Sequence, residues 1–491
     1  MDSTNKLPTI IQGGMGIAVS NWVLANAVSR RDQMGVVSGT GIDSVLARRL
    51  QLGDPGGHMR RAMEYFPWPE MARRVLDAYF IPGGKPADAP FKLNPMKKMK
   101  LGRRSVELLI VSNFVEVWLA REDHEGVVGI NYLEKIQRPT LPSMLGAMLG
   151  GVDFVLMGAG IPLAIPGILD KIAQWDVAEL RLAAADNPNR HSYVQTFDPR
   201  QYAEGELFPL KRPKFLAIIS SEILAQTFVR RASGYTDGFI VEYHTAGGHN
   251  APPRKDRDFP DRVNQYGPKD EPDVAAIAAI GRPFWMAGGY ATPERIRWAL
   301  DNGAAGVQLG SIFATADESG LVPEIRQEII DRYLSGDLTV RTDFIASPTG
   351  FPFKVVDVDG TVGLNDVYEE RDRICDMGYL REMYSIDENK VGYRCASEPI
   401  SDFVDKGGTE DGAAGRRCLC NGLMATIGLG QVRENGIAEP AVVTGGDDFS
   451  FLDHLLKDGA TSYNANDVLD YLLCSSKSET VAVAVPEQLV Q

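Results

Sequence analysis

Short apolar runs alternate with helical segments along most of the chain between residues 9 and 309. The runs are rich in Val, Ile, Leu and Phe and are bounded by glycine or polar residues, as in buried parallel strands. Most segments between them place apolar residues three and four positions apart, as in amphipathic helices. We predict eight strands, over residues 9–11, 34–38, 127–132, 153–157, 215–219, 238–243, 283–287 and 305–309. This pattern predicts an α/β fold, and eight strands favour a closed (β/α)8 TIM barrel over an open sheet.

Residues 287–311 form the clearest strand–helix–strand unit. Thr292 and Pro293 suit the start of its helix, and Asn-Gly at residues 302–303 suits its end. The first strand ends in Gly-Gly at residues 288–289, and the second ends in Gly-Ser at residues 310–311. A single glycine pair is more often only a tight turn, but paired phosphate loops after the last two strands are common in these barrels. The pair of loops therefore favours a phosphate site.

Two regions depart from the barrel pattern. Residues 54–125 carry helical periodicity without strand signals, with helices expected over 59–65, 71–79 and 105–120, and predict a helical insertion that serves as a lid or an oligomer contact. Residues 343–474 are rich in glycine and charge and predict a C-terminal extension, followed by a flexible tail over 475–491. The barrel is assigned to residues 1–53 and 126–342. Residues 176–212 are polar and are expected to be irregular.

Composition and charge restrict the partners of this chain. Acidic residues outnumber basic ones by 65 to 51, and the net charge of −14 argues against a nucleic-acid partner. No apolar run reaches membrane-spanning length and no signal-peptide pattern begins the chain, so we expect a cytoplasmic protein without a membrane partner. The basic run at residues 97–104 favours a solvated helix face over an anion site.

Cysteines leave one question of metal binding open. Four of the five lie in one stretch, and they are compatible with a four-thiolate zinc or iron–sulfur site. The usual C-x2-C spacing is absent, however, and free buried thiols are common. Whether a metal binds therefore stays open for Cys375, Cys395, Cys418 and Cys420.

Candidate chemistry gathers at the predicted strand ends. The first strand runs into a glycine-rich loop at residues 12–16, and Ser20 is expected to cap the helix that follows. His249 follows the sixth strand behind Gly247 and Gly248, which bring the backbone close to a ligand over the barrel mouth. An imidazole at that place can hydrogen-bond or deprotonate a substrate, whereas a surface histidine is the simpler alternative. His244 is a nearby rival.

Four motifs resemble the nitronate monooxygenase (2-nitropropane dioxygenase) family: QGGMG at residues 12–16, AGGH at 246–249, AGGYATPE at 287–294 and GVQLGSIF at 306–313. That family comprises FMN-dependent (β/α)8 barrels, and it shares its pattern with flavin-dependent enoyl reductases of fatty-acid synthesis. The resemblance covers the barrel but not the insertion. The chain departs from many relatives at Thr245, where they have Glu, and at Ile219, where some have Lys.

The resemblance implies a role for individual residues. His249 matches the active-site histidine, and Asn131 matches an asparagine near the pyrimidine edge of the flavin. The cofactor-binding residues implied at the other loops are Gly13, Gly14, Met15, Gly247, Gly248, Gly288, Gly289, Gly310 and Ser311.

Three functions stay open on these grounds. The first is an FMN-dependent oxidoreductase that oxidises nitronates or nitroalkanes with O2 to a carbonyl compound and nitrite. The second is an NAD(P)H-dependent flavin reductase that acts on an enoyl thioester or a quinone. The third is a non-catalytic flavin-binding or assembly protein. For each of these functions we expect a small-molecule ligand, and each is compatible with a homo-oligomer.

Overall fold

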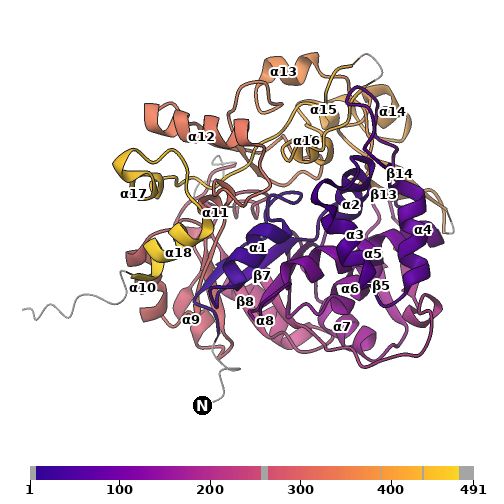
Figure 1. Cartoon of the computed structure of the whole chain (residues 1–491), viewed down its shortest axis with the longest axis horizontal. Helices are drawn as coiled ribbons and strands as arrows, with labels where there is room; N and C mark the ends of the chain where they lie inside the picture. Colours follow the sequence, from indigo (N-terminus) through magenta and orange to yellow (C-terminus); the bar gives the residue numbers. More distant parts are fainter. Residues whose placement is uncertain (1–6, 256–263, 389, 434–435, 475–491) are drawn as a thin grey trace, which may run out of the picture.

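Eight parallel strands close into a barrel in the computed structural model, which describes residues 7–255, 264–388, 390–433 and 436–474 (Figure 1). The predicted tail at 475–491 lies outside these residues. In the order in which they pair around the barrel, the strands are β1 (Ile10–Gln12), β2 (Met34–Ser38), β3 (Val128–Leu133), β4 (Phe154–Gly158), β7 (Lys214–Ile219), β8 (Gly238–Glu242), β9 (Phe284–Ala287) and β10 (Gly306–Leu309). The predicted (β/α)8 fold is confirmed, and each predicted strand is present.

Closure of the barrel depends on the short first strand. In β1, Ile10 aligns with Val307 of β10 and Ile11 with Met34 of β2. The interior is filled by large apolar side chains from successive strands, among them Leu156, Leu216, Ile240 and Trp285. Because all eight strands are parallel, the loops that follow them meet at one end of the barrel.

Helices follow most strands and form the outer ring, as expected: α1 (Trp22–Ser29), α6 (Thr140–Leu149), α7 (Ile165–Ala173), α8 (Glu222–Arg231), α9 (Val274–Ala278) and α10 (Pro293–Asp301). Helix α2 (Ile42–Gln51) also follows its strand, β2, but lies outside this ring. Thr292 caps α10 by accepting a hydrogen bond from the amide of Arg295, as predicted. The expected cap of α1 is wrong by one residue, since Asn21 accepts from the Leu24 amide. Ser20 is instead bound to the loop after β1.

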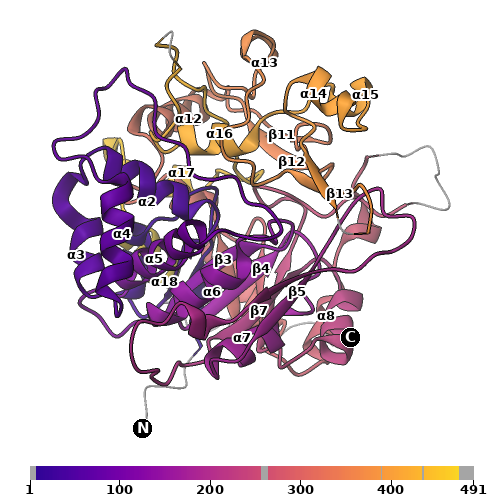
Figure 2. The same cartoon turned by 90° about the vertical axis from the view of Figure 1, so that its right-hand side faces the viewer.

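The expected helices of the insertion are present as α3 (His58–Glu64), α4 (Pro69–Tyr79) and α5 (Arg103–Ala120). Helix α5 packs against α1 and α6 and so stands in the ring between β2 and β3. Its outer side is covered by α2, α3 and α4 (Figure 2), and nearly all of its residues are buried. This burial explains why its sequence is apolar on every face.

The C-terminal extension lies above the barrel in Figure 2. Helix α12 (Pro323–Ser335) and most of β11 (Val340–Asp343) precede the predicted start of the extension at residue 343. The extension itself contains β12 (Phe353–Val356), which pairs with β11, the hairpin β13 (Glu382–Ser385)–β14 (Val391–Arg394), and the helices α13 (Asn365–Glu370), α14 (Ile400–Asp405), α15 (Glu410–Ala413), α16 (Leu419–Ala425) and α17 (Leu452–Leu455). The last helix, α18 (Ala465–Cys474), returns to the barrel and packs against α1, α10 and the short α11 (Ser311–Ala314). No helix of the described residues is long and apolar enough to cross a membrane.

Two further expectations about local structure are wrong. Residues 176–212 contain an antiparallel hairpin, β5 (Ala178–Leu182) and β6 (Tyr193–Phe197), whose side chains alternate between buried and exposed. The exposed face of this hairpin carries the polar residues Glu179, Arg181 and Thr196, which explains part of the polar composition that suggested a loop. In the basic run at 97–104, helix α5 begins only at Arg103, and Lys97 is 2% exposed rather than solvated.

Lys97 is buried because it pairs with Asp43 of α2, which is 1% exposed. The hydroxyl of Tyr379, from the extension, donates to the same carboxylate. The Lys97 ammonium also lies 5.0 Å from the centroid of the Tyr379 ring. This cluster therefore joins the barrel, the insertion and the extension through one buried charge pair.

Replacing Lys97 by Met should lower the free energy of unfolding by about 3–5 kcal/mol, because the Asp43 carboxylate would stay buried without its cation. Urea unfolding followed by circular dichroism measures the loss. Lys98→Met is the matched control, since the Lys98 side chain is exposed. A loss below about 1 kcal/mol for the Lys97 variant, as for a surface pair, would contradict this account.

Candidate functional site

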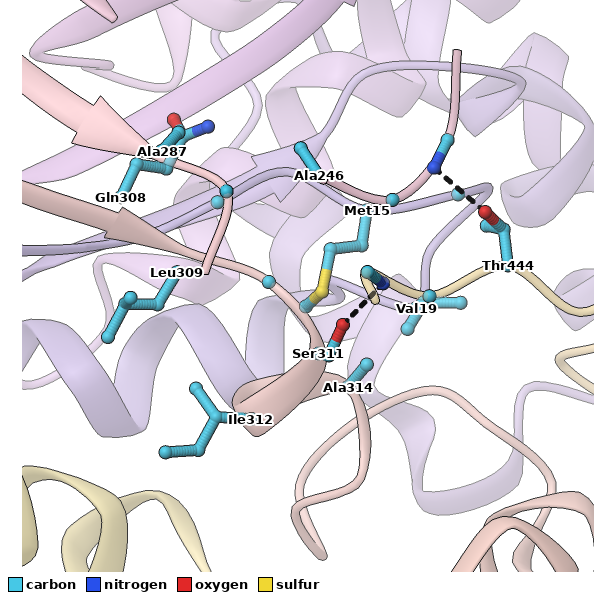
Figure 3. Close-up of a pocket in the computed structure, with 18 of the residues that line it drawn as sticks. Met15, Val19, Ala246, Ala287, Gln308, Leu309, Ser311, Ile312, Ala314 and Thr444 are labelled. Carbon is cyan, nitrogen blue, oxygen red and sulfur yellow. Dashed lines mark hydrogen bonds between the residues drawn. The ribbon is translucent and has the colours of Figure 1, made fainter. Parts of the chain in front are cut away.

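Three adjoining cavities open at the carboxyl end of the barrel. The first has an open volume of ≈ 1080 Å³, counting the solvent at its mouth, and is lined by the glycine-rich loops after β1, β9 and β10 (Figure 3). The second extends toward β3 and β4, and the third lies over β7 and β8. The first two share several lining residues, including Gly14, Gly248 and Gln308, so they form one continuous site.

Every residue that the sequence assigned to the site lines this set of cavities. The first cavity is lined by Gly13, Gly14, Met15, Gly247, Gly248, Gly288, Gly289, Gly310 and Ser311. Asn131 lines the second cavity, and His249 lines the second and the third. Strand closure thus brings together loops that are up to about three hundred residues apart in the chain.

Buried hydrogen bonds hold the loop after β1 in place. The Ser20 hydroxyl accepts from the Met15 amide at 2.9 Å and donates to the carbonyl of Gly13 at 2.8 Å. The side chain of Gln12 donates to the same hydroxyl at 2.9 Å. Met15 is therefore presented to the first cavity on a fixed backbone, and Figure 3 shows its side chain there.

The loop after β9 requires glycine for two different reasons. Gly288 and Gly289 have φ angles of 93° and 79°, in the left-handed region that other residues rarely adopt. A Cβ atom on Gly288 would lie 2.8 Å from the Thr245 hydroxyl oxygen. A Cβ atom on Gly289 would meet only that hydroxyl at 3.9 Å and would otherwise project into open space beside the cavity. The loop therefore exposes bare backbone to a ligand.

The extension supplies a wall of the first cavity that sequence reasoning missed. The hydroxyl of Thr444 accepts from the Gly248 amide at 2.8 Å, and the Gly446 amide donates to the hydroxyl of Ser311 at 2.8 Å (Figure 3). The Asp447 amide donates to the Thr245 carbonyl at 3.0 Å. The sequence did contain a signal for this wall, since Thr-Gly-Gly at 444–446 is a further glycine pair beside a hydroxyl residue. It was missed because, unlike the other glycine loops, it does not follow a predicted strand.

His249 is held in one orientation at the barrel mouth. Its Nε2 lies 2.7 Å from the hydroxyl oxygen of Ser347, and its ring packs edge-on against Phe353 with centroids 4.9 Å apart. Burial, and secondarily the charge of Lys135, hold the pKa of His249 well below its usual value. The imidazole is therefore neutral near pH 7. His244 instead packs against Tyr266 in the third cavity, with centroids 4.3 Å apart.

Glu242, the last residue of β8, is a site residue that the sequence analysis missed. Its side chain lines all three cavities. Burial raises the pKa of Glu242 to about 8, so the carboxyl group is mostly protonated at neutral pH. Glu242 could have been recognised from the sequence, because it is the one acidic residue at the end of an otherwise apolar strand. That end is where barrel enzymes place reactive groups.

Gln308 of β10 carries an unsatisfied polar atom at the same place. Its Oε1 is buried and has no hydrogen-bond partner among the described residues, although the side chain lines the first and second cavities. A buried acceptor without a partner costs free energy, so a ligand that donates a hydrogen bond there would be favoured.

The cysteines do not form a metal site in the part of the chain that the structure describes, where no group of three or more His, Cys, Asp or Glu side chains could hold an ion. Cys375, Cys395, Cys418 and Cys420 are free thiols. Burial raises the pKa of Cys375 to about 11 and that of Cys418 to about 12. Since the thiolate is the form that binds a metal, these values favour buried, protonated thiols.

No family model matches the chain. Its sequence also matches no curated protein. Among solved structures, the chain is similar to FabK from Thermotoga maritima, with 17% identity over 72% of each chain and a TM-score of 0.39. It is also similar to nitroalkane oxidase from Streptomyces ansochromogenes, with 12% identity over 95% of each chain and a TM-score of 0.44. A third is the enoyl reductase domain of MlnA from the macrolactin biosynthesis cluster of Bacillus amyloliquefaciens, with 12% identity over 96% of each chain and a TM-score of 0.45. At these identities the likeness concerns the fold.

Replacing Gly289 by Ala should raise the dissociation constant of the expected flavin mononucleotide about tenfold or more, because the added methyl group would keep the ligand from the backbone. Fluorescence titration of the apoprotein with FMN measures this constant. Gly336→Ala is the matched control, since Gly336 has a φ of 80°, has open space around its Cβ position and ends α12 outside the cavities. Equal FMN affinity in both variants would contradict the assignment of Gly289.

Proposed function

We propose that this protein is an FMN-dependent oxidoreductase of the nitronate monooxygenase type, which oxidises nitronates or nitroalkanes with O2 to a carbonyl compound and nitrite. The observation that carries the proposal is a neutral, firmly oriented imidazole, that of His249, at the edge of a cavity made of glycine loops. The four sequence motifs that resemble this family supply the loops of the same cavity. The position of His249, its neutral form and the glycine backbone around it therefore all support the deprotonation of a nitroalkane.

The cavity fits FMN in two respects. A Cβ atom at Gly289 or Gly248 would project into open space, so bare backbone faces the ligand at both loops. The unpartnered Oε1 of Gln308 can accept a hydrogen bond from an N–H on the edge of a flavin ring. The phosphate group would lie at Gly288, Gly289, Gly310 and Ser311, and the ring near Gly14, Met15 and Asn131. FMN, when bound, supplies the redox chemistry by taking electrons from the substrate and passing them to O2.

His249 acts on the proton of the substrate. Its Nε2 is engaged with Ser347, and Nδ1 has no partner among the described residues, so Nδ1 is the nitrogen available to a ligand. A neutral Nδ1 can remove the proton from the carbon that bears a nitro group, which leaves the nitronate anion. Because the pKa of His249 is depressed, the ring keeps this basic form at neutral pH.

Glu242 gives a specific reason to retain a second candidate, the NAD(P)H-dependent reduction of an enoyl thioester or a quinone. A reductase must donate a proton to the substrate after hydride transfer. With a pKa of about 8, the Glu242 carboxyl is protonated at neutral pH and lines every part of the site. The same cavity thus offers a proton acceptor in His249 and a proton donor in Glu242.

Replacing His249 by Gln should lower kcat/KM for nitroethane by about 10²–10⁴-fold, because the general base is lost. The preformed anion ethylnitronate needs no deprotonation, so its kcat/KM should fall far less. Oxygen consumption and nitrite release measure both, with FMN content checked by absorbance. His244→Gln is the control variant and should retain activity with both substrates. Equal losses for nitroethane and ethylnitronate would show that His249 is not the base.

Anaerobic mixing separates the two candidate functions. For the FMN-loaded protein, ethylnitronate should bleach the flavin absorbance rapidly, whereas NADPH and NADH should not. Stopped-flow absorbance records both reactions under the same conditions. Rapid bleaching by a nicotinamide nucleotide and none by nitronate would reject nitronate oxidation and favour the reductase.

A further inference from the structure

We propose that a chain of two hydroxyl groups carries protons between His249 and the amine of Lys135. The hydroxyls belong to Ser347 and Thr349, on the segment between β11 and β12. The direction and purpose of the transfer rest on the proposed function, because a base that deprotonates a substrate must afterwards dispose of a proton. The hydrogen-bonded chain itself can be tested independently of any turnover.

The links of the chain are continuous. Nε2 of His249 lies 2.7 Å from the hydroxyl oxygen of Ser347, which lies 2.8 Å from the hydroxyl oxygen of Thr349. Nζ of Lys135 lies 3.4 Å from that Thr349 oxygen, which is the longest link. Three different parts of the fold contribute, namely the loop after β8, the segment between β11 and β12, and the loop after β3. Such a chain requires hydroxyl groups because each one can accept and donate at once.

The middle of the chain is held rigidly. Ser347 is completely buried, and the Arg416 guanidinium donates to its carbonyl at 2.7 Å. The carboxylate of Asp343 accepts from the Ala346 amide at 2.8 Å, which fixes the turn before Ser347. The Thr349 amide donates to the Ser347 hydroxyl oxygen at 3.3 Å. Both hydroxyls are therefore ordered without a substrate.

Lys135 is suited to end the chain. It does not line the three cavities, and its ammonium group lies 4.1 Å from the centroid of the Phe351 ring. Burial lowers the pKa of Lys135 to about 7, against the opposing effect of the neighbouring Glu134 carboxylate. A neutral amine is therefore present near pH 7 and can accept a proton. The side chain is half-buried, so the proton can afterwards leave to water.

The groups that set the charge around the chain are few. Glu134 is next to Lys135 and accepts a hydrogen bond from Gln137 at 2.7 Å. Lys135 is the charged group that lowers the pKa of His249. Arg416 binds the backbone carbonyl of Ser347 and lies on the other side of the segment. A proton that moved from His249 to Lys135 would thus come to rest beside the Glu134 carboxylate.

The protons balance as follows. The substrate C–H bond breaks, its electron pair stays on the substrate as the nitronate, and the proton bonds to Nδ1 of His249. The proton on Nε2 then passes to the Ser347 oxygen, the Ser347 proton passes to Thr349, and the Thr349 proton passes to the Lys135 amine. The result is a neutral imidazole of the other tautomer and an ammonium group at Lys135. The pocket is left without a persistent imidazolium.

Four variants test the relay in turnover. Lys135→Arg keeps the cation but cannot accept a proton, Lys135→Met removes both properties, and Thr349→Val removes the second hydroxyl. We expect kcat/KM for nitroethane to fall about tenfold or more in all three, with ethylnitronate unaffected. Thr342→Val, on β11 and outside the hydrogen-bonded chain, should have the same kcat/KM as the unmodified protein. If Lys135→Arg behaves like the unmodified protein, Lys135 acts only through its charge and the relay is wrong.

The pH profile gives a readout that a purely structural role would not produce. In the unmodified protein, kcat/KM for nitroethane should fall as the pH drops through about 7, because Lys135 becomes an ammonium group and can no longer accept the proton. This inflection should disappear in Lys135→Arg and Lys135→Met. An inflection near pH 7 that persists in both variants would overturn the relay.

Nuclear magnetic resonance tests the chain without turnover. In protein labelled with ¹⁵N-histidine and assigned with His249→Gln, the Nε2 shift of His249 should inflect near pH 7. The inflection should be absent in Thr349→Val and Lys135→Met but present in Thr342→Val. An undiminished inflection in Thr349→Val would mean coupling through space alone and would overturn the relay. If nitroethane and ethylnitronate are not turned over at all, the proposed function fails. The resonance measurement still decides whether the hydrogen-bonded chain from His249 to Lys135 exists.

Discussion

The site depends on one set of hydrogen bonds, those that tie the C-terminal extension to the mouth of the barrel. Thr444 binds the Gly248 amide, Gly446 binds Ser311, and the Lys354 amide of β12 donates to the Gly248 carbonyl at 2.9 Å. An open barrel mouth would leave these loop groups facing water. With the extension in place, these loops are held by hydrogen bonds, and Val442, Thr444 and Gly446 of the extension line part of the cavity.

Enclosure of the cavity explains the protonation states of its two titratable groups. Burial disfavours the charged form of any group, so it lowers the pKa of His249 and raises that of Glu242. Both are therefore neutral at pH 7, although one is a base and the other an acid. A single physical cause thus keeps one base and one acid neutral in the loop that begins at the end of β8. The proposed oxidation would use the base, and its reductase alternative would use the acid.

The additions to the barrel also complete its architecture. Helix α5 lies within the insertion but occupies a ring position between α1 and α6, and α18, at the end of the described chain, packs against α1 and α10. The buried Asp43–Lys97 pair and the Tyr379 hydroxyl then connect barrel, insertion and extension. These contacts pack the insertion and the extension firmly against the barrel.

Local sequence patterns were enough to predict the barrel strands, the helices of the insertion and the glycine loops that line the cavities. These features are local, because strand runs, helix caps such as Thr292 and glycine pairs leave their signal within a few residues. Long-range contacts, in contrast, place Ser20 against the first loop instead of at a helix cap, bury Lys97, and bring Thr444–Gly446 to the wall of the cavity. Burial in the folded protein also shifts the pKa values of Glu242 and Lys135, and folding brings Ser347 next to His249. Each of these features depends on burial or on contacts between residues that are far apart in the chain. Neither burial nor such contacts can be deduced from a few neighbouring residues.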